Sequence, residues 1–135
     1  MWDRLFKPMD TLQRGLSAGW MRNAVIRNNL ANVETPNFKA SEVEFESLMK
    51  KAAEEGGFVG YRTHEKHIPI GSGDLDSVVP LVYQQRGLSM RMDGNNVDIE
   101  SENVRLVQNQ ILYNTIMEKL NGEIRRMRMA ITEGR

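Results

Sequence analysis

The chain contains no cysteine, which excludes disulfide bonds and thiolate chemistry. Its 18 basic and 18 acidic residues cancel, so no net charge attracts it to nucleic acid or to anionic lipid. No apolar run approaches the roughly 18 residues that a membrane-spanning helix requires. The start, MWDRLFKPMDTLQRG, also lacks the apolar stretch of a cleaved secretory signal. We therefore expect one soluble domain and, if the protein leaves the cytosol, export without a cleaved signal.

Motifs that carry chemistry are missing too. The stretch HEKH, residues 64–67, resembles the zinc motif H-E-x-x-H, but Ile68 stands where the second histidine should be and Pro69 opposes a helix. The stretch DGNNVDIE, residues 93–100, fails as a calcium loop because Val97 occupies its fifth position. Glycine-rich phosphate loops and nucleophile elbows do not occur. We expect no catalytic site, no metal, no cofactor and no small-molecule substrate, and an enzymatic or metal-binding helical domain is the disfavoured alternative.

What the chain does contain is a long amphipathic pattern near its start. Apolar residues recur at alternating steps of three and four, which predicts a helix from about Pro8 to Val33, roughly 38 Å long. Pro36 disfavours helical backbone at Thr35, which predicts an abrupt end. The seam of this helix consists of Met9, Leu12, Leu16, Gly19, Asn23, Ile26, Leu30 and Val33.

A second long helix is predicted from Asp98 onward. Asp98 is a credible N-cap, and Glu100 and Glu102 place negative charge in the first turn. Its first seam consists of Val104, Val107, Ile111 and Asn114. An apolar stripe continues through Ile116, Leu120, Ile124, Met127 and Ile131.

The two seams align in one antiparallel register. In it Val33 faces Val104, Leu30 faces Val107, Ile26 faces Ile111 and Asn23 faces Asn114. A buried asparagine pair costs stability but fixes register, so we expect the two helices to pair in this way.

The middle of the chain is polar and irregular. Residues 38–55 predict an extended lead-in and a short helix that Gly56-Gly57 ends. Residues 58–80 predict a loop, and a small β-hairpin is expected around Asp93-Gly94. The fold class is therefore mainly α, with the chain divided into residues 1–37, 38–97 and 98–135. Two helices and a loop cannot bury Trp2, Leu5, Phe6 and Trp20, so neighbouring copies or partners must supply surface.

Three stretches carry a resemblance to known proteins. NNLANVETPNFKA, residues 28–40, is similar to the N-terminal signature of flagellar rod and hook axial proteins. The matching residues are Asn29, Leu30, Ala31, Asn32, Thr35, Pro36 and Phe38. Asn37 replaces the usual glycine, and both residues tolerate left-handed backbone. MRMDGNNVDIESENVRLVQNQILYN, residues 90–114, together with RTHEKHI, resembles the proximal rod proteins of that family, while the proline-rich segment usual in a companion type is missing.

The resemblance implies a mechanical role and no enzymatic activity. Such a protein is a structural subunit of the flagellar basal-body rod, which crosses the periplasm. It polymerises through its terminal helices and transmits torque from the motor ring to the hook. The implied partners are further copies of the chain, other rod proteins, the junction between the rod and the membrane ring, and the flagellar type III export apparatus. The alternative is another secreted flagellar axial or hook-junction coiled-coil component.

Overall fold

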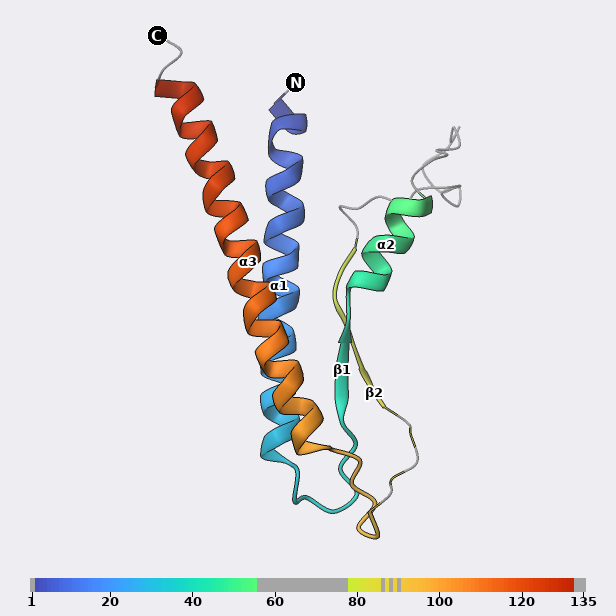
Figure 1. The fold of residues 1–135 in the computed structure, drawn as a ribbon. Coiled ribbons are helices and arrows are strands. Elements are labelled where there is room, and N and C mark those ends of the chain that lie inside the picture. Colours follow the sequence, from blue (N-terminus) through green and yellow to red (C-terminus); the bar gives the residue numbers. More distant parts are fainter. Residues whose placement is uncertain (1, 56–77, 86, 88, 90, 133–135) are drawn as a thin grey trace, which may run out of the picture. The chain divides into compact units, whose positions relative to one another are not determined.

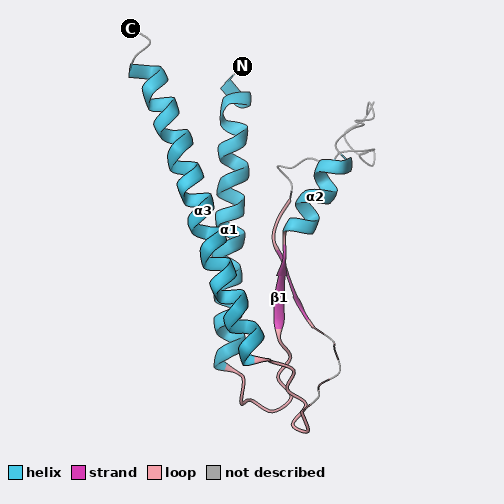
Figure 2. Ribbon diagram, in the orientation of Figure 1, coloured by secondary structure: helices cyan, strands magenta, loops and turns pink. Residues whose placement is uncertain are grey.

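A computed structural model describes residues 2–55, 78–85, 87, 89 and 91–132. The elements follow in the order α1 (Trp2–Ala31), β1 (Ser41–Glu44), α2 (Glu46–Glu55), β2 (Leu81–Gln84) and α3 (Ile99–Thr132) (Figure 1). The predicted mainly helical class with a small β element in the middle is confirmed (Figure 2). The predicted loop lies almost entirely outside the described residues, as does HEKH.

The chain forms two compact units. One comprises Met1–Val43 and Val82–Arg135 and contains both long helices, and the other comprises Glu44–Leu81 and contains α2. Figure 1 shows α1 and α3 side by side over part of their length and separated toward the ends marked N and C. In the second unit, Ser47 Oγ in the first turn of α2 donates to Oε1 of Glu44, which precedes the helix, at 2.6 Å.

The helix α1 begins at Trp2, so the predicted start at Pro8 is wrong. Proline lacks an N–H group and therefore removes one helical bond, the one to the carbonyl of residue 4. A single lost bond in the second turn of a 30-residue helix does not stop it.

The end of α1 also differs from the prediction, because the helix stops at Ala31 and turns follow through Asn37. The backbone N–H of Asn32 is shared between the carbonyls of Asn28 and Asn29, at 3.2 and 3.1 Å. The helix has thus ended before Pro36 acts, and the prediction that this proline ends it is wrong.

The contacts between α1 and α3 involve glycines of α1. Asn109 Nδ2 donates to the Gly19 carbonyl at 2.8 Å. A Cβ atom on Gly19 would lie 3.3 Å from Tyr113 Cδ2, and one on Gly15 would lie 3.3 Å from Ile116 Cδ1. Residue numbers rise along α3 as they fall along α1, so the pair is antiparallel, as predicted. The glycines allow the close approach of the two helices.

The predicted register of this pair is wrong. Val104, Val107 and Ile111 are 56%, 60% and 63% exposed, so they do not pack against α1. The pairings this overturns are Val33 with Val104, Leu30 with Val107 and Ile26 with Ile111. The fourth pairing, Asn23 with Asn114, belongs to the same register, and Asn114 instead accepts a bond from Gln110 on its own helix at 3.1 Å. Spacing identifies residues that share a face, but α3 carries two such faces, and the glycines of α1 select the other one.

The strands β1 and β2 form a two-stranded antiparallel sheet. The second strand is therefore Leu81–Gln84, and the hairpin expected around Asp93-Gly94 is replaced by a turn in which Gly94 N–H donates to the Arg91 carbonyl at 3.1 Å. In the unit that contains α1 and α3, the buried apolar side chains that the structure describes are few: Ala18, Ile26, Ala40, Val43 and Val97.

Candidate assembly interface

Asn29 joins the end of α1 to β1 and to α3. Its Nδ2 donates to the Ser41 carbonyl at 2.8 Å, and its Oδ1 accepts the Ser41 N–H at 3.0 Å. The amide thus bonds both backbone groups of one residue, as a neighbouring strand would. The same Nδ2 also donates to Glu102 Oε2 at 3.1 Å. Asn29 is fully buried and Glu102 nearly so, and each finds a partner in the other.

Asn95 closes the loop that follows α1. Its Nδ2 donates to the carbonyls of Asn32, Val33 and Thr35 at 2.9, 3.0 and 2.9 Å. Its Oδ1 accepts the Val97 N–H at 2.7 Å. Carbonyls past the end of a helix need such partners, and a fully buried side chain supplies them here.

Asn96 lies at the end of the sheet ladder. The Gln85 N–H donates to the Ala40 carbonyl at 2.8 Å. Asn96 Oδ1 accepts the Ala40 N–H at 2.6 Å, and Asn96 Nδ2 donates to the Gln85 carbonyl at 3.2 Å. Ala40 and Gln85 share one direct backbone hydrogen bond, and the Asn96 amide bonds the two backbone groups that this bond leaves over. We call Asn29, Asn95 and Asn96, with the backbone they bond, the amide corner.

A pair of left-handed residues completes the amide corner. Asn37 has φ 61° and donates its N–H to the Asp93 carbonyl at 2.8 Å, while Gly94 has φ 75°. A Cβ on Gly94 would lie 2.6 Å from Asn37 Oδ1, so another residue there would displace the Asn37 side chain and would have to adopt a left-handed backbone that glycine adopts freely. Lys39 Nζ donates to the Gly94 carbonyl at 2.7 Å. The signature after α1 and the Asp93-Gly94 stretch before α3 are thus two halves of one structure.

A carboxylate pair lies beside the corner. Arg105 Nη1 is 3.2 Å from Glu102 Oε1 and 4.0 Å from Glu42 Oε1. The hydrogen bond that Gln85 Nε2 donates to Glu42 at 2.8 Å, with the charge of Arg105 and a bond from Tyr83, holds the pKa of Glu42 below its ordinary value.

Asp98 precedes α3 and its Oδ1 accepts the Glu100 N–H at 3.0 Å, the bond of an N-cap.

The side of α3 that faces away from α1 is apolar. Val104, Val107 and Ile111 follow one another at steps of three and four, which places them on one face, and each is more than half exposed. We call these three residues the outer face. Further along the helix Ile124 and Ile131 are also exposed, whereas Ile116, Leu120 and Met127 are half-buried.

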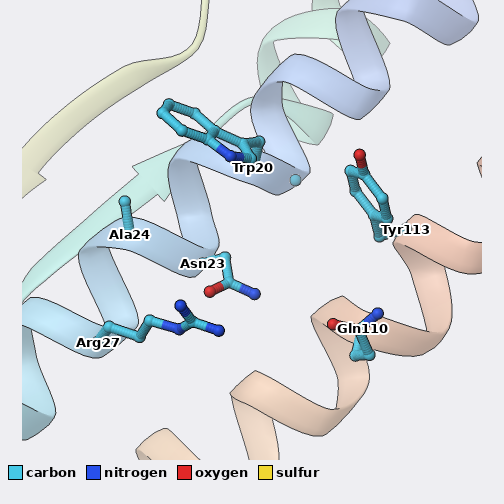
Figure 3. A pocket seen from close by; sticks show the side chains of 7 residues that line it. Trp20, Asn23, Ala24, Arg27, Gln110 and Tyr113 are labelled. Atoms are coloured by element: carbon cyan, nitrogen blue, oxygen red, sulfur yellow. The ribbon is translucent and has the colours of Figure 1, made fainter.

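The predicted seam of α1 is partly covered. Ile26 is buried. Gly19 is buried as well, and the others are half-buried: Met9, Leu12, Leu16, Asn23, Leu30 and Val33. A groove lies next to this seam between α1 and α3, and its lining includes Trp20, Asn23, Arg27, Gln110 and Tyr113 (Figure 3). Trp20 is 70% exposed, as predicted.

Within the described residues, no group of three or more histidine, aspartate or glutamate side chains is placed to hold a metal ion. No described helix is both long and apolar enough to cross a membrane. Among the described residues, α3 carries exposed aliphatic area at Val104, Val107 and Ile111.

We compared the chain with known proteins, and the three relatives reported below share one protein name. The chain is 33% identical to the flagellar basal body rod protein FlgB of Bacillus subtilis, covering 94% of this chain and 95% of the relative. It is 30% identical to the protein of that name from Yersinia enterocolitica, covering 99% and 100%. It is 37% identical to that from Borreliella burgdorferi, covering 79% and 82%. No known family model matches the chain.

Proposed function

The chain belongs to the FlgB family of flagellar basal body rod proteins, and from that membership we propose that it is a structural subunit of the proximal rod. The names of the relatives favour this role over a hook-junction or other axial component. Its proposed task is mechanical: copies and other rod proteins pack through α1 and α3, and the packed helices transmit torque from the motor ring to the hook.

The outer face is the observation that carries this proposal. A monomer gains nothing from three aliphatic side chains in water on the side of α3 that its own α1 does not cover. Burying one such side chain contributes about 1.5–3 kcal/mol, so a neighbouring helix over this face would gain several kcal/mol per subunit. The remaining residues predicted to pack, from Met9 to Val33 and from Ile116 to Ile131, are proposed to complete the contacts between subunits.

The proposed location follows from the same membership. The rod of the basal body is the proposed site of assembly, and the junction to the membrane ring is proposed to lie at one end of it. Export by the flagellar type III apparatus, without a cleaved signal, is the proposed route to the periplasm. No step of this role calls for catalysis, a cofactor, a nucleic acid or a small-molecule substrate.

A charge on the outer face tests the proposal. Val104→Asp should abolish swimming and rod assembly, because a carboxylate cannot be buried against a neighbouring apolar helix without a partner. Asn103→Asp adds the same charge at an adjacent exposed position of α3 and should leave swimming nearly unchanged. Swimming in soft agar and electron microscopy of isolated basal bodies provide the measurements, with circular dichroism and expression level as folding controls. A Val104→Asp strain that swims normally would overturn the assignment of this face.

A further inference from the structure

The two strands of the small sheet differ at their outer edges. In an antiparallel pair, residues alternately direct their N–H and C=O groups toward the partner strand and away from it. The bond from Gln85 to Ala40 places residues 81, 83 and 85 of the second strand toward β1. Val82 and Gln84 therefore direct their backbone groups to the outer edge of β2.

The outer edge of β1 is already bonded. Ser41 directs its N–H and C=O away from β2, and both are bonded by the side chain of Asn29. Two of the four residues of β1, Glu42 and Glu44, are acidic. Buried hydrogen-bonding groups and charges are the ways in which proteins protect a strand edge from further pairing.

The outer edge of β2 has none of this protection within the part of the chain that the structure describes. The sheet described has two strands, so no described strand lies beside this edge. All four residues of β2, Leu81, Val82, Tyr83 and Gln84, are exposed and uncharged. Val and Tyr favour strands, so the backbone edge at Val82 and Gln84 is suited for pairing.

We propose that β2 is a second association surface, at which two copies of the chain pair their β2 strands antiparallel through the outer edges. The occupant is a second copy because the segment is complementary to itself: it carries no charge to repel its own image, and a two-fold axis can satisfy both outer residues at once. In that register Val82 of one copy is hydrogen-bonded to Gln84 of the other. Tyr83 then faces Tyr83 of the partner subunit as a non-hydrogen-bonded pair, the arrangement in which side chains are closest.

The pairing has two physical consequences. Four residues from each strand give an interface well below the roughly 1,200 Å² of stable complexes, so the dimer is weak and depends on concentration. A two-fold contact is also closed and cannot propagate into a filament, unlike the helix contacts proposed for the rod. The β2 dimer therefore belongs to the free chain, and its failure leaves the proposed rod function intact.

Cysteine crosslinking tests the register directly, since the chain has no native cysteine. The variant Tyr83→Cys should form a disulfide-linked dimer under mild oxidation, because facing residues of such a pair lie within disulfide range. Met92→Cys is the matched control, since Met92 is more exposed than Tyr83 and lies in a turn outside β2 and outside both long helices. Equal crosslinking of the two variants would mean random collision and would overturn the proposal.

Sedimentation velocity over a concentration series tests the edge itself. The wild-type chain should shift from monomer toward dimer as concentration rises. Val82→Pro removes an N–H at the outer edge without touching a bond to β1, and Val82→Lys charges the edge; both should lose the dimer while retaining the wild-type circular dichroism spectrum. A wild-type chain that stays monomeric into the millimolar range, or a dimer that survives in Val82→Lys, would overturn the proposal. Strains with either variant should still swim, whereas the outer-face variant should not.

Discussion

The amide corner and the outer face invert the usual rule of polar residues outside and apolar residues inside. In the corner, Asn29 and Asn95 are fully buried, and on the outer face three aliphatic side chains are more than half exposed. Buried amides require complete sets of partners, and the corner supplies them from within one chain. Exposed aliphatic side chains require another surface. The chain thus satisfies the buried amides of the corner by itself, whereas its exposed aliphatic side chains need neighbouring molecules to cover them.

The largest expected effect on stability comes from a substitution in the amide corner. Asn95→Ala removes the three bonds that its amide donates to the carbonyls of Asn32, Val33 and Thr35 and leaves the buried Val97 N–H without its acceptor, and we expect a loss of about 3 kcal/mol in the free energy of unfolding. Urea denaturation of the purified chain measures it. Asn103→Ala, at an exposed position, is the control and should change stability by less than about 0.5 kcal/mol. Similar stabilities for the two variants would mean that the corner does not hold the monomer together.

A smaller effect comes from the contact between the helices. Gly19→Val should destabilise the chain by about 1–3 kcal/mol, because the added side chain meets Tyr113 and Asn109. Gly122→Val is the matched change on α3, where an added Cβ meets nothing within 4 Å, and it should stabilise by up to about 0.5 kcal/mol through helix propensity. Thermal denaturation followed by circular dichroism compares the two. Equal effects of the same sign would show that α1 and α3 do not approach closely at Gly19.

The smallest expected effect is the pH dependence of Glu42, beside the corner. Its pKa is lowered in the folded state, mainly by the hydrogen bond from Gln85. The stabilisation is therefore complete above the ordinary glutamate pKa of about 4.3 and is lost as pH falls through the lower folded value. Urea midpoints of wild type and Glu42→Gln, measured from pH 6 to pH 3, should converge at the acid end. A gap that stays constant with pH would contradict this account.

The sequence predicted the long helices better than it predicted the amide corner. Apolar spacing predicted two long antiparallel helices, and the Asp98 cap and the short helix α2 followed from local chemistry. The register failed because α3 offers two apolar faces, and the decisive contact involves Gly19 and Asn109, which an apolar pattern ignores. The strand Leu81–Gln84 was missed because its partner lies 40 residues earlier and four exposed residues give no alternation.

The asparagines show the limit most clearly. The run after residue 28 was recognisable as a signature, but the roles of Asn95 and Asn96 depend on a loop that returns from a distant part of the chain. No periodic signal identifies a side chain that bonds backbone some 60 residues away. The only sequence signal for these roles was the adjacent pair Asn95-Asn96 directly after Asp93-Gly94. From the sequence, we interpreted that pair as part of a turn.

The Asn29 amide has a consequence for how the chain would respond to force. Its two bonds to Ser41 and its bond to Glu102 radiate from one rigid planar group to two different elements. Displacement of α1 along its axis strains all three together, whereas strands pulled apart from one end lose their bonds one after another. Bonds strained together share the force and yield at a single higher threshold. One asparagine thus makes the connection stiff in shear, and a leucine of similar volume at that place would leave it compliant.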